Sequence, residues 1–132
     1  MAPIRPILRS AGVTEQQWRV LRVLADEGAC DPSHLGQAAL LHAPSVTRIL
    51  KELGERGLVS RVTDPSDGRR SIVSISLQGS ELVATVAQQT RVLLHKYATR
   101  FGAERLANLQ DELRALSETV AAFAPENSVG ED

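Results

Sequence analysis

An amphipathic helix followed directly by two short β-branched segments is the feature that most restricts the fold of this chain. The helix is predicted to begin near Pro44, since the first turn does not need the N–H that proline lacks, and to end at Gly57. At about 100° per residue, four apolar residues share one side of it: Val46, Ile49, Leu50 and Leu53. Residues 58–63 and 71–75 read as strands, and the turn of five or six residues between them starts at Asp64, with Arg69 and Arg70 leading into the second strand. This hairpin tip is too polar for a core, so its arginines must be solvated or bound to an anion.

Two further short helices are predicted before this segment. Thr14 and Gln17 have the spacing of a capping box, and Gly28 can end the helix that follows. Asp31 and Pro32 fit the N-cap and first position of the next helix. Three short helices followed by a hairpin are typical of a winged helix-turn-helix.

The rest of the chain is predicted to be helical. Ser76 can cap a long helix that Gly102 interrupts, and a last helix starts near Ala103. Its apolar residues are spaced by three and four, as in a heptad seam: Leu106, Leu109, Leu113, Leu116, Val120 and Phe123. A partner helix is needed to cover this seam. A second copy of the chain is the simplest candidate, and packing back onto the same chain is the alternative.

The fold class predicted from these elements is mainly α with a small β-hairpin wing, in which long helices form a dimerisation region. Residues 13–77 are the predicted winged helix-turn-helix. Residues 1–12 and 78–124 are the predicted helical dimerisation region, and residues 125–132 form a polar, acidic tail that we expect to be disordered.

The net charge of −1 hides a division along the chain. Residues 1–78 carry ten Lys and Arg against eight Asp and Glu, whereas residues 79–132 carry five against eight. This distribution fits a local anion-binding face on a neutral body.

Several classes of protein are excluded by what the sequence lacks. A single Cys allows neither a disulfide framework nor a Cys-rich zinc site, and His34, His42 and His95 are too dispersed for a metal site. No apolar run approaches the roughly 20 residues of a spanning helix, and the N-terminus has no secretory pattern. We therefore expect a cytoplasmic protein without a membrane partner, metal or cofactor. No catalytic motif is present either, so an enzyme is not expected.

The segment from residue 44 to residue 79 resembles a known family. Its matching runs are Pro44-Ser45-Val46-Thr47-Arg48-Ile49-Leu50, Arg56-Gly57-Leu58-Val59-Ser60-Arg61 and Asp64-Pro65-Ser66-Asp67-Gly68-Arg69-Arg70. In order and spacing they resemble the MarR family of bacterial transcription regulators, over roughly residues 13–125. Arg5-Pro6-Ile7-Leu8 and residues 12–19 are similar to the subgroup that regulates operons for degradation of homoprotocatechuate, an aromatic acid.

The resemblance implies a homodimeric repressor whose two lobes read a palindromic site in double-stranded DNA. The expected DNA-binding residues are Ser45, Thr47, Arg48, Lys51, Arg69 and Arg70. Arg48 and Lys51 would reach guanine or phosphate in the major groove, and Arg69, with Arg70, would enter the minor groove. Asp67 would orient the Arg69 guanidinium through a bidentate pair.

The same resemblance implies regulation of an aromatic-compound catabolism operon by a small effector. Trp18, Arg22, Arg9 and Arg5 are the candidates for binding an aromatic carboxylate, by stacking and by charge pairing. The alternative is that Trp18 is core and the arginines are solvated. Two other functions stay open: redox sensing through Cys30, and a winged-helix module that binds proteins.

Two positions depart from the family pattern. Only four residues precede Arg5, where relatives usually have a full helix, so we expect either a reduced dimer interface or a start assigned too late. His42 and Ala43 stand where relatives often have a serine cap, and His42 is the alternative cap or phosphate contact.

Overall fold

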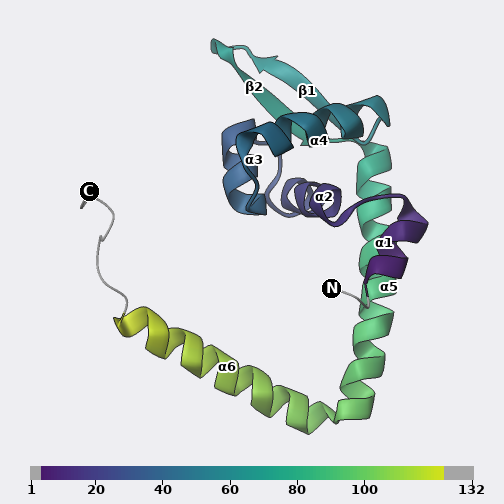
Figure 1. The fold of residues 1–132 in the computed structure, drawn as a ribbon, viewed down its shortest axis with the longest axis vertical. Helices are drawn as coiled ribbons and strands as arrows, with labels where there is room; N and C mark the ends of the chain where they lie inside the picture. Colours follow the sequence, from purple (N-terminus) through teal and green to yellow (C-terminus); the bar gives the residue numbers. More distant parts are fainter. Residues whose placement is uncertain (1–3, 124–132) are drawn as a thin grey trace. The chain divides into compact units, whose positions relative to one another are not determined.

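The computed structural model describes residues 4–123, so the predicted tail at 125–132 lies outside the described residues. Figure 1 shows the helices and the hairpin in chain order: α1 Arg5–Ala11, α2 Glu15–Glu27, α3 Pro32–Ala39, α4 Ala43–Glu55, β1 Val59–Asp64, β2 Asp67–Ile75, α5 Leu77–Phe101 and α6 Ala103–Phe123. The predicted fold class, helices with a β-hairpin wing, is confirmed. The described chain divides into two compact units, residues 4–91 and 92–123, and each is described by itself.

Side-chain caps start α2 and α3 where the sequence predicts them. The Thr14 hydroxyl accepts from the Gln17 amide at 3.1 Å, and the Gln17 side chain accepts from the Thr14 amide at 3.0 Å. Asp31 accepts from the backbone N–H of His34 at 2.8 Å, with Pro32 in the first turn. At the start of α4 the His42 side chain makes no capping hydrogen bond, so its predicted capping role is not observed. The Thr14 and Asp31 side chains each accept from a backbone N–H that has no partner within its helix.

The core of residues 4–91 lies between α2, α3, α4, the base of the hairpin and the first turns of α5. Its fully buried side chains include Leu21, Leu24, Leu35, Ile49, Leu53, Val73 and Val86. The predicted apolar side of α4 is confirmed, because Val46 and Leu50 are also buried. This burial fixes which side of α4 faces solvent.

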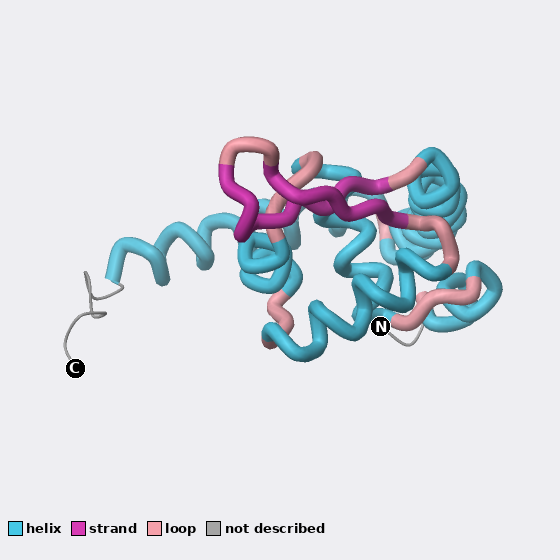
Figure 2. Tube along the Cα trace, turned by 90° about the horizontal axis from the view of Figure 1, so that it is seen from above, coloured by secondary structure: helices cyan, strands magenta, loops and turns pink. Residues whose placement is uncertain are grey.

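The hairpin is longer and its turn tighter than predicted. β1 and β2 are antiparallel, with Val59 opposite Ile75 and Thr63 opposite Ser71. The strands run side by side in Figure 2, and the turn between them holds only residues 65 and 66. The Asp64 carboxylate closes this turn by accepting from the amide and hydroxyl of Ser66, at 2.9 and 2.8 Å. The prediction of a five- or six-residue tip was therefore wrong, and residues 67–70 are strand residues.

The C-terminal helices expose much of their apolar surface within this single chain. Gly102, with φ of 108°, separates α5 from α6, as predicted. None of the residues of α6 is buried, and the seam residues from Leu109 to Phe123 are between 46% and 84% exposed. Among residues 4–123, no helix is both long and apolar enough to span a bilayer.

Candidate nucleic-acid interface

Helix α4 presents polar and basic side chains on the side opposite the core. Arg48 and Lys51 are both exposed on it, whereas Ser45 is half-buried at its edge. The Thr47 hydroxyl donates to the carbonyl of Ala43 at 3.1 Å, which leaves its oxygen lone pairs available to another donor. An exposed helix with two cations and two hydroxyls has the chemistry to contact phosphates and base edges.

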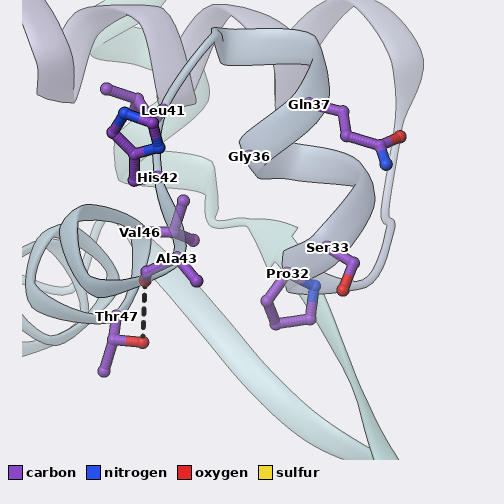
Figure 3. A pocket seen from close by; sticks show the side chains of 9 residues that line it. All are labelled: Pro32, Ser33, Gly36, Gln37, Leu41, His42, Ala43, Val46 and Thr47. Carbon is purple, nitrogen blue, oxygen red and sulfur yellow. Dashed lines mark hydrogen bonds between the residues drawn. The ribbon is translucent and has the colours of Figure 1, made fainter. Parts of the chain in front are cut away.

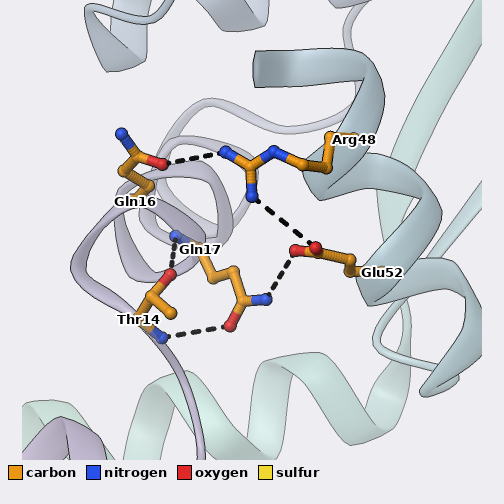
Figure 4. A network of polar contacts seen from close by, with 5 residues as sticks. All are labelled: Thr14, Gln16, Gln17, Arg48 and Glu52. Carbon is orange, nitrogen blue, oxygen red and sulfur yellow. Dashed lines mark hydrogen bonds and ion pairs between the residues drawn. The ribbon is translucent and has the colours of Figure 1, made fainter. Parts of the chain in front are cut away.

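Arg48 is exposed, and its guanidinium makes two polar contacts with neighbouring side chains. Its Nη2 donates to Oε1 of Gln16 in α2 at 3.2 Å, and its Nη1 lies 3.6 Å from Oε2 of Glu52 (Figure 4). Glu52 thus pairs with a cation one turn earlier on the same helix. Among residues 4–123, Glu55 takes part in no ion pair.

The two wing arginines have different environments. Arg69 is exposed on β2, and its guanidinium makes no ion pair within the described residues. Arg70 instead donates from Nη2 to the Asp31 carboxylate at 2.8 Å, which ties the wing to the start of α3. Arg69 is therefore the freer of the two for an external anion.

Asp67 acts on the backbone and not on the Arg69 side chain. Its Oδ1 accepts from the Arg69 backbone N–H at 3.0 Å. The predicted bidentate pair with the guanidinium is not formed between these residues, because the carboxylate is used to shape the strand next to the turn. Arg61 bonds locally on the wing, from Nε to the Ser71 hydroxyl at 3.0 Å.

A groove of about 380 Å³ lies between α3 and the start of α4. Figure 3 shows its lining, which combines apolar residues with Ser33, Gln37, His42 and Thr47. Ser33 and Gln37 were missed by the sequence reasoning. The signal available for Ser33 was its place in the first turn of the helix before α4, where side chains can reach an anion near open N–H groups.

The four predicted effector residues do not form one cluster. Trp18 and Arg22 line a cavity of about 220 Å³ between α2 and the end of α3, together with Leu40. Arg5 and Arg9 line a separate cavity of about 210 Å³ beside the end of α1. The Arg5 guanidinium is paired with Glu15 at 2.9 Å. The single binding cluster predicted from the sequence was wrong in this respect.

The Trp18 cavity has an aromatic wall and a cation beside it. Trp18 is only 7% exposed, so it also belongs to the core, as the alternative interpretation held. The Arg22 guanidinium lies 5.7 Å from the centre of the Trp18 ring and 3.3 Å from the Asp26 carboxylate. Leu40 at its edge is 81% exposed and has a φ of 60°, which is unusual for a branched side chain.

Cys30 has the environment of an unreactive thiol. It is half-buried, and its backbone pairs with Val73 of the wing. Burial, followed by the nearby carboxylates of Asp31 and Glu27, raises the pKa of the thiol above its ordinary value. Because the thiolate is the reactive species, this environment disfavours redox sensing.

Comparison with known proteins relates this arrangement to transcription regulators. The sequence model of the MarR family matches residues 11–70. The HTH-type transcriptional regulator FarR of Neisseria gonorrhoeae is 33% identical over 117 residues, which cover 89% of this chain and 80% of that protein. The homoprotocatechuate degradative operon repressor of Escherichia coli is 32% identical over 109 residues, covering 83% and 74%.

The chain is also similar to a solved structure. The crystal structure of NadR in complex with 4-hydroxyphenylacetate has a TM-score of 0.72 and 34% sequence identity to this chain. The likeness covers 88% of this chain and 82% of that one.

Proposed function

Because this chain belongs to the MarR family of transcription regulators, we propose that it represses an operon for aromatic-compound catabolism and that a small aromatic carboxylate releases it from DNA. Its relatives are named as transcriptional regulators and not as enzymes. The Escherichia coli relative is named for an operon of aromatic acid degradation, and this supports the proposed pathway class. Action in the cytoplasm is part of the same proposal.

The observation that carries the DNA-binding part is the exposed basic side of α4. The buried residues of α4 turn Arg48 and Lys51 outward, and Arg69 is exposed on the wing of the same unit. A helix in the major groove with an arginine in the adjacent minor groove would use all three cations. Phosphate contacts would supply affinity, and Arg48 would read a base.

Binding of duplex DNA at several salt concentrations tests this part. Fragments retained by the purified protein from genomic DNA are sequenced, and one is used as the probe. Affinity should fall steeply with salt, because each neutralised phosphate releases counterions. Arg69→Ala should weaken binding roughly tenfold or more, whereas Glu118→Ala, on α6, should change it little. Binding that does not depend on salt, or no retained DNA, would favour the protein-binding alternative.

The Trp18 cavity is the proposed effector site. A ring would stack against Trp18, and the effector carboxylate would take the place of Asp26 as the partner of Arg22. NadR, a relative of similar structure, was solved with 4-hydroxyphenylacetate, which has this combination of ring and carboxylate. Arg5 and Arg9 would take no part, since they line the other cavity.

A panel of ligands tests the effector site. Benzoate, phenylacetate and 4-hydroxyphenylacetate should weaken DNA binding and raise the melting temperature, while benzyl alcohol, which lacks the carboxylate, should not. Arg22→Gln should abolish the response, and the matched variant Arg9→Gln in the other cavity should keep it. The effector proposal is wrong if no carboxylate changes either property, and the site is wrong if Arg9→Gln is the variant that loses the response.

A further inference from the structure

A chain of polar contacts connects the start of α2 to the exposed side of α4. Gln17 is buried in the capping box, and its Nε2 donates to Oε1 of Glu52 at 3.0 Å. The other oxygen of Glu52 lies 3.6 Å from Arg48 Nη1, and Arg48 Nη2 donates to Gln16 at 3.2 Å. Figure 4 shows the guanidinium of Arg48 between Gln16 and Glu52, with Gln17 bonded to Glu52.

The Arg48–Glu52 pair by itself contributes little to stability on physical grounds. Arg48 is 55% exposed and Glu52 is 39% exposed, and exposed pairs of this kind have small effects on unfolding. A carboxylate on the flank of a DNA-facing helix also repels phosphate. The hydrogen bond from Gln17 gives Glu52 a structural role, but neither stability nor non-specific affinity explains why its other oxygen lies beside Arg48.

Preorganisation of Arg48 supplies that explanation. A free arginine side chain occupies many rotamers, and those rotamers must be lost when both arms of its fork contact the O6 and N7 atoms of guanine. Glu52 is itself fixed by Gln17, whose amide oxygen is used in the cap of α2. The start of α2 thus fixes Gln17, Gln17 fixes Glu52, and Glu52 orients the guanidinium of Arg48.

Resting on the proposed DNA-binding function, we propose that Glu52 is a positioning residue that holds Arg48 for reading one base pair, and that it sets sequence specificity rather than total affinity. The opposite role would be sequestration, in which Glu52 withholds Arg48 from DNA. The two roles predict different effects of removing the Glu52 charge.

The test compares two charge-neutralising variants on the same helix. Glu52→Gln keeps an oxygen that can accept from Gln17 but loses the charge opposite Arg48. Glu55→Gln removes the same charge from a carboxylate that has no ion pair among residues 4–123. A duplex enriched by the wild-type protein from a randomised pool is the probe, together with versions in which each G·C pair is replaced and a scrambled duplex.

One G·C pair in each half-site should be the one that Arg48 reads. Its replacement should weaken wild-type binding on the order of tenfold, and this penalty should be absent in Arg48→Ala. Glu52→Gln should reduce the same penalty several-fold, while its binding to the scrambled duplex becomes tighter. Glu55→Gln should tighten binding to both duplexes and leave the penalty unchanged. In an Arg48→Ala background, Glu52→Gln should not alter the ratio between specific and scrambled duplexes.

Three results overturn the proposal. Glu52→Gln with an unchanged penalty and tighter binding everywhere would show sequestration or simple repulsion. A penalty that persists in Arg48→Ala would show that Arg48 reads no base, although DNA binding itself would stand. Failure of the wild-type protein to enrich any duplex would instead remove the proposed function. Equal melting temperatures of the two glutamine variants show that an altered penalty does not come from unfolding.

Discussion

The Asp31 carboxylate joins two parts of the winged unit that are far apart in sequence. It caps α3 through the His34 amide and accepts from the Arg70 guanidinium of β2, both at 2.8 Å. These interactions, with the His34 hydrogen bond as the larger cause, hold the pKa of Asp31 below its ordinary value of 3.8. One side chain therefore stabilises a helix end and the position of the wing.

The acid dependence of stability should reveal this role. A lowered pKa means that folding favours the charged carboxylate, so its contribution is present above the ordinary pKa and is lost as pH falls through the lowered one. Asp31→Ala should therefore unfold at lower denaturant than wild type from about pH 7 to about pH 5, and the gap should close below pH 3.8. Denaturant titrations across this range measure the gap.

Asp26→Ala is the control for the acid dependence of Asp31. Asp26 belongs to an exposed pair with Arg22 at a spacing of four residues. Its removal should change the midpoint little at any pH, since such pairs are weak. A gap between wild type and Asp31→Ala that is constant down to about pH 3 would contradict the assigned role.

Sequence reasoning identified the wing arginines but not what distinguishes them. Arg69 and Arg70 are adjacent in β2, yet only Arg70 meets Asp31, which is 39 residues earlier. A contact over that separation depends on packing of the wing against α3. Asp67 was expected to pair with the Arg69 side chain, but it accepts a hydrogen bond from the Arg69 backbone N–H. Which of the two groups it binds depends on the local backbone geometry.

At the scale of elements, the start of α5 packs closely against the base of the hairpin. A Cβ atom added at Gly79 would lie 2.3 Å from the carbonyl oxygen of Leu58 and 2.7 Å from a side-chain carbon of Ile75. The Leu58 carbonyl already accepts from the Ser76 amide at 3.0 Å, which restricts its movement. Glycine at position 79 therefore allows α5 to approach β1.

Gly79→Ala should destabilise the protein by roughly 1–2 kcal/mol, because an overpacking cost of about 2–3 kcal/mol at so close a contact exceeds the gain in helix propensity from alanine, about 1 kcal/mol. Gly54→Ala is the matched control in α4, where an added Cβ would meet nothing within 4 Å. That variant should be more stable than wild type by up to about 1 kcal/mol. Denaturant unfolding at one fixed protein concentration measures both, and a stabilised Gly79→Ala would show that the contact relaxes freely.

Helix ends were predictable because their causes are local. Thr14 with Gln17, and Asp31 with Pro32, carry the complete capping chemistry within four residues. The wing turn was less predictable, because the Asp64 carboxylate closes it with two bonds to Ser66 and leaves fewer residues in the loop. The four predicted effector residues line two cavities instead of one. Arg9 and Trp18 are near in sequence but lie on different helices, α1 and α2.

For the whole molecule, the apolar seam of α6 is the feature that one chain leaves uncovered. Leu113 is 56% exposed, and the seam continues to Phe123, which is 84% exposed. Long uncovered apolar surfaces mark interfaces, and a heptad spacing fits a facing helix. A second copy related by a two-fold axis would cover the seam and place two copies of α4 for a palindromic site.

Leu113→Glu should therefore yield a monomer, because a charge in the seam would be buried without a partner. Sedimentation should give about half the wild-type mass, and operator affinity should fall by a factor on the order of 100 as the second set of arginines is lost. Asn108→Glu adds the same side chain to α6 outside the seam and should leave mass and affinity unchanged. If Leu113→Glu keeps the wild-type mass, the seam is not the dimer contact; if it becomes monomeric and binds as tightly, one lobe is sufficient for recognition.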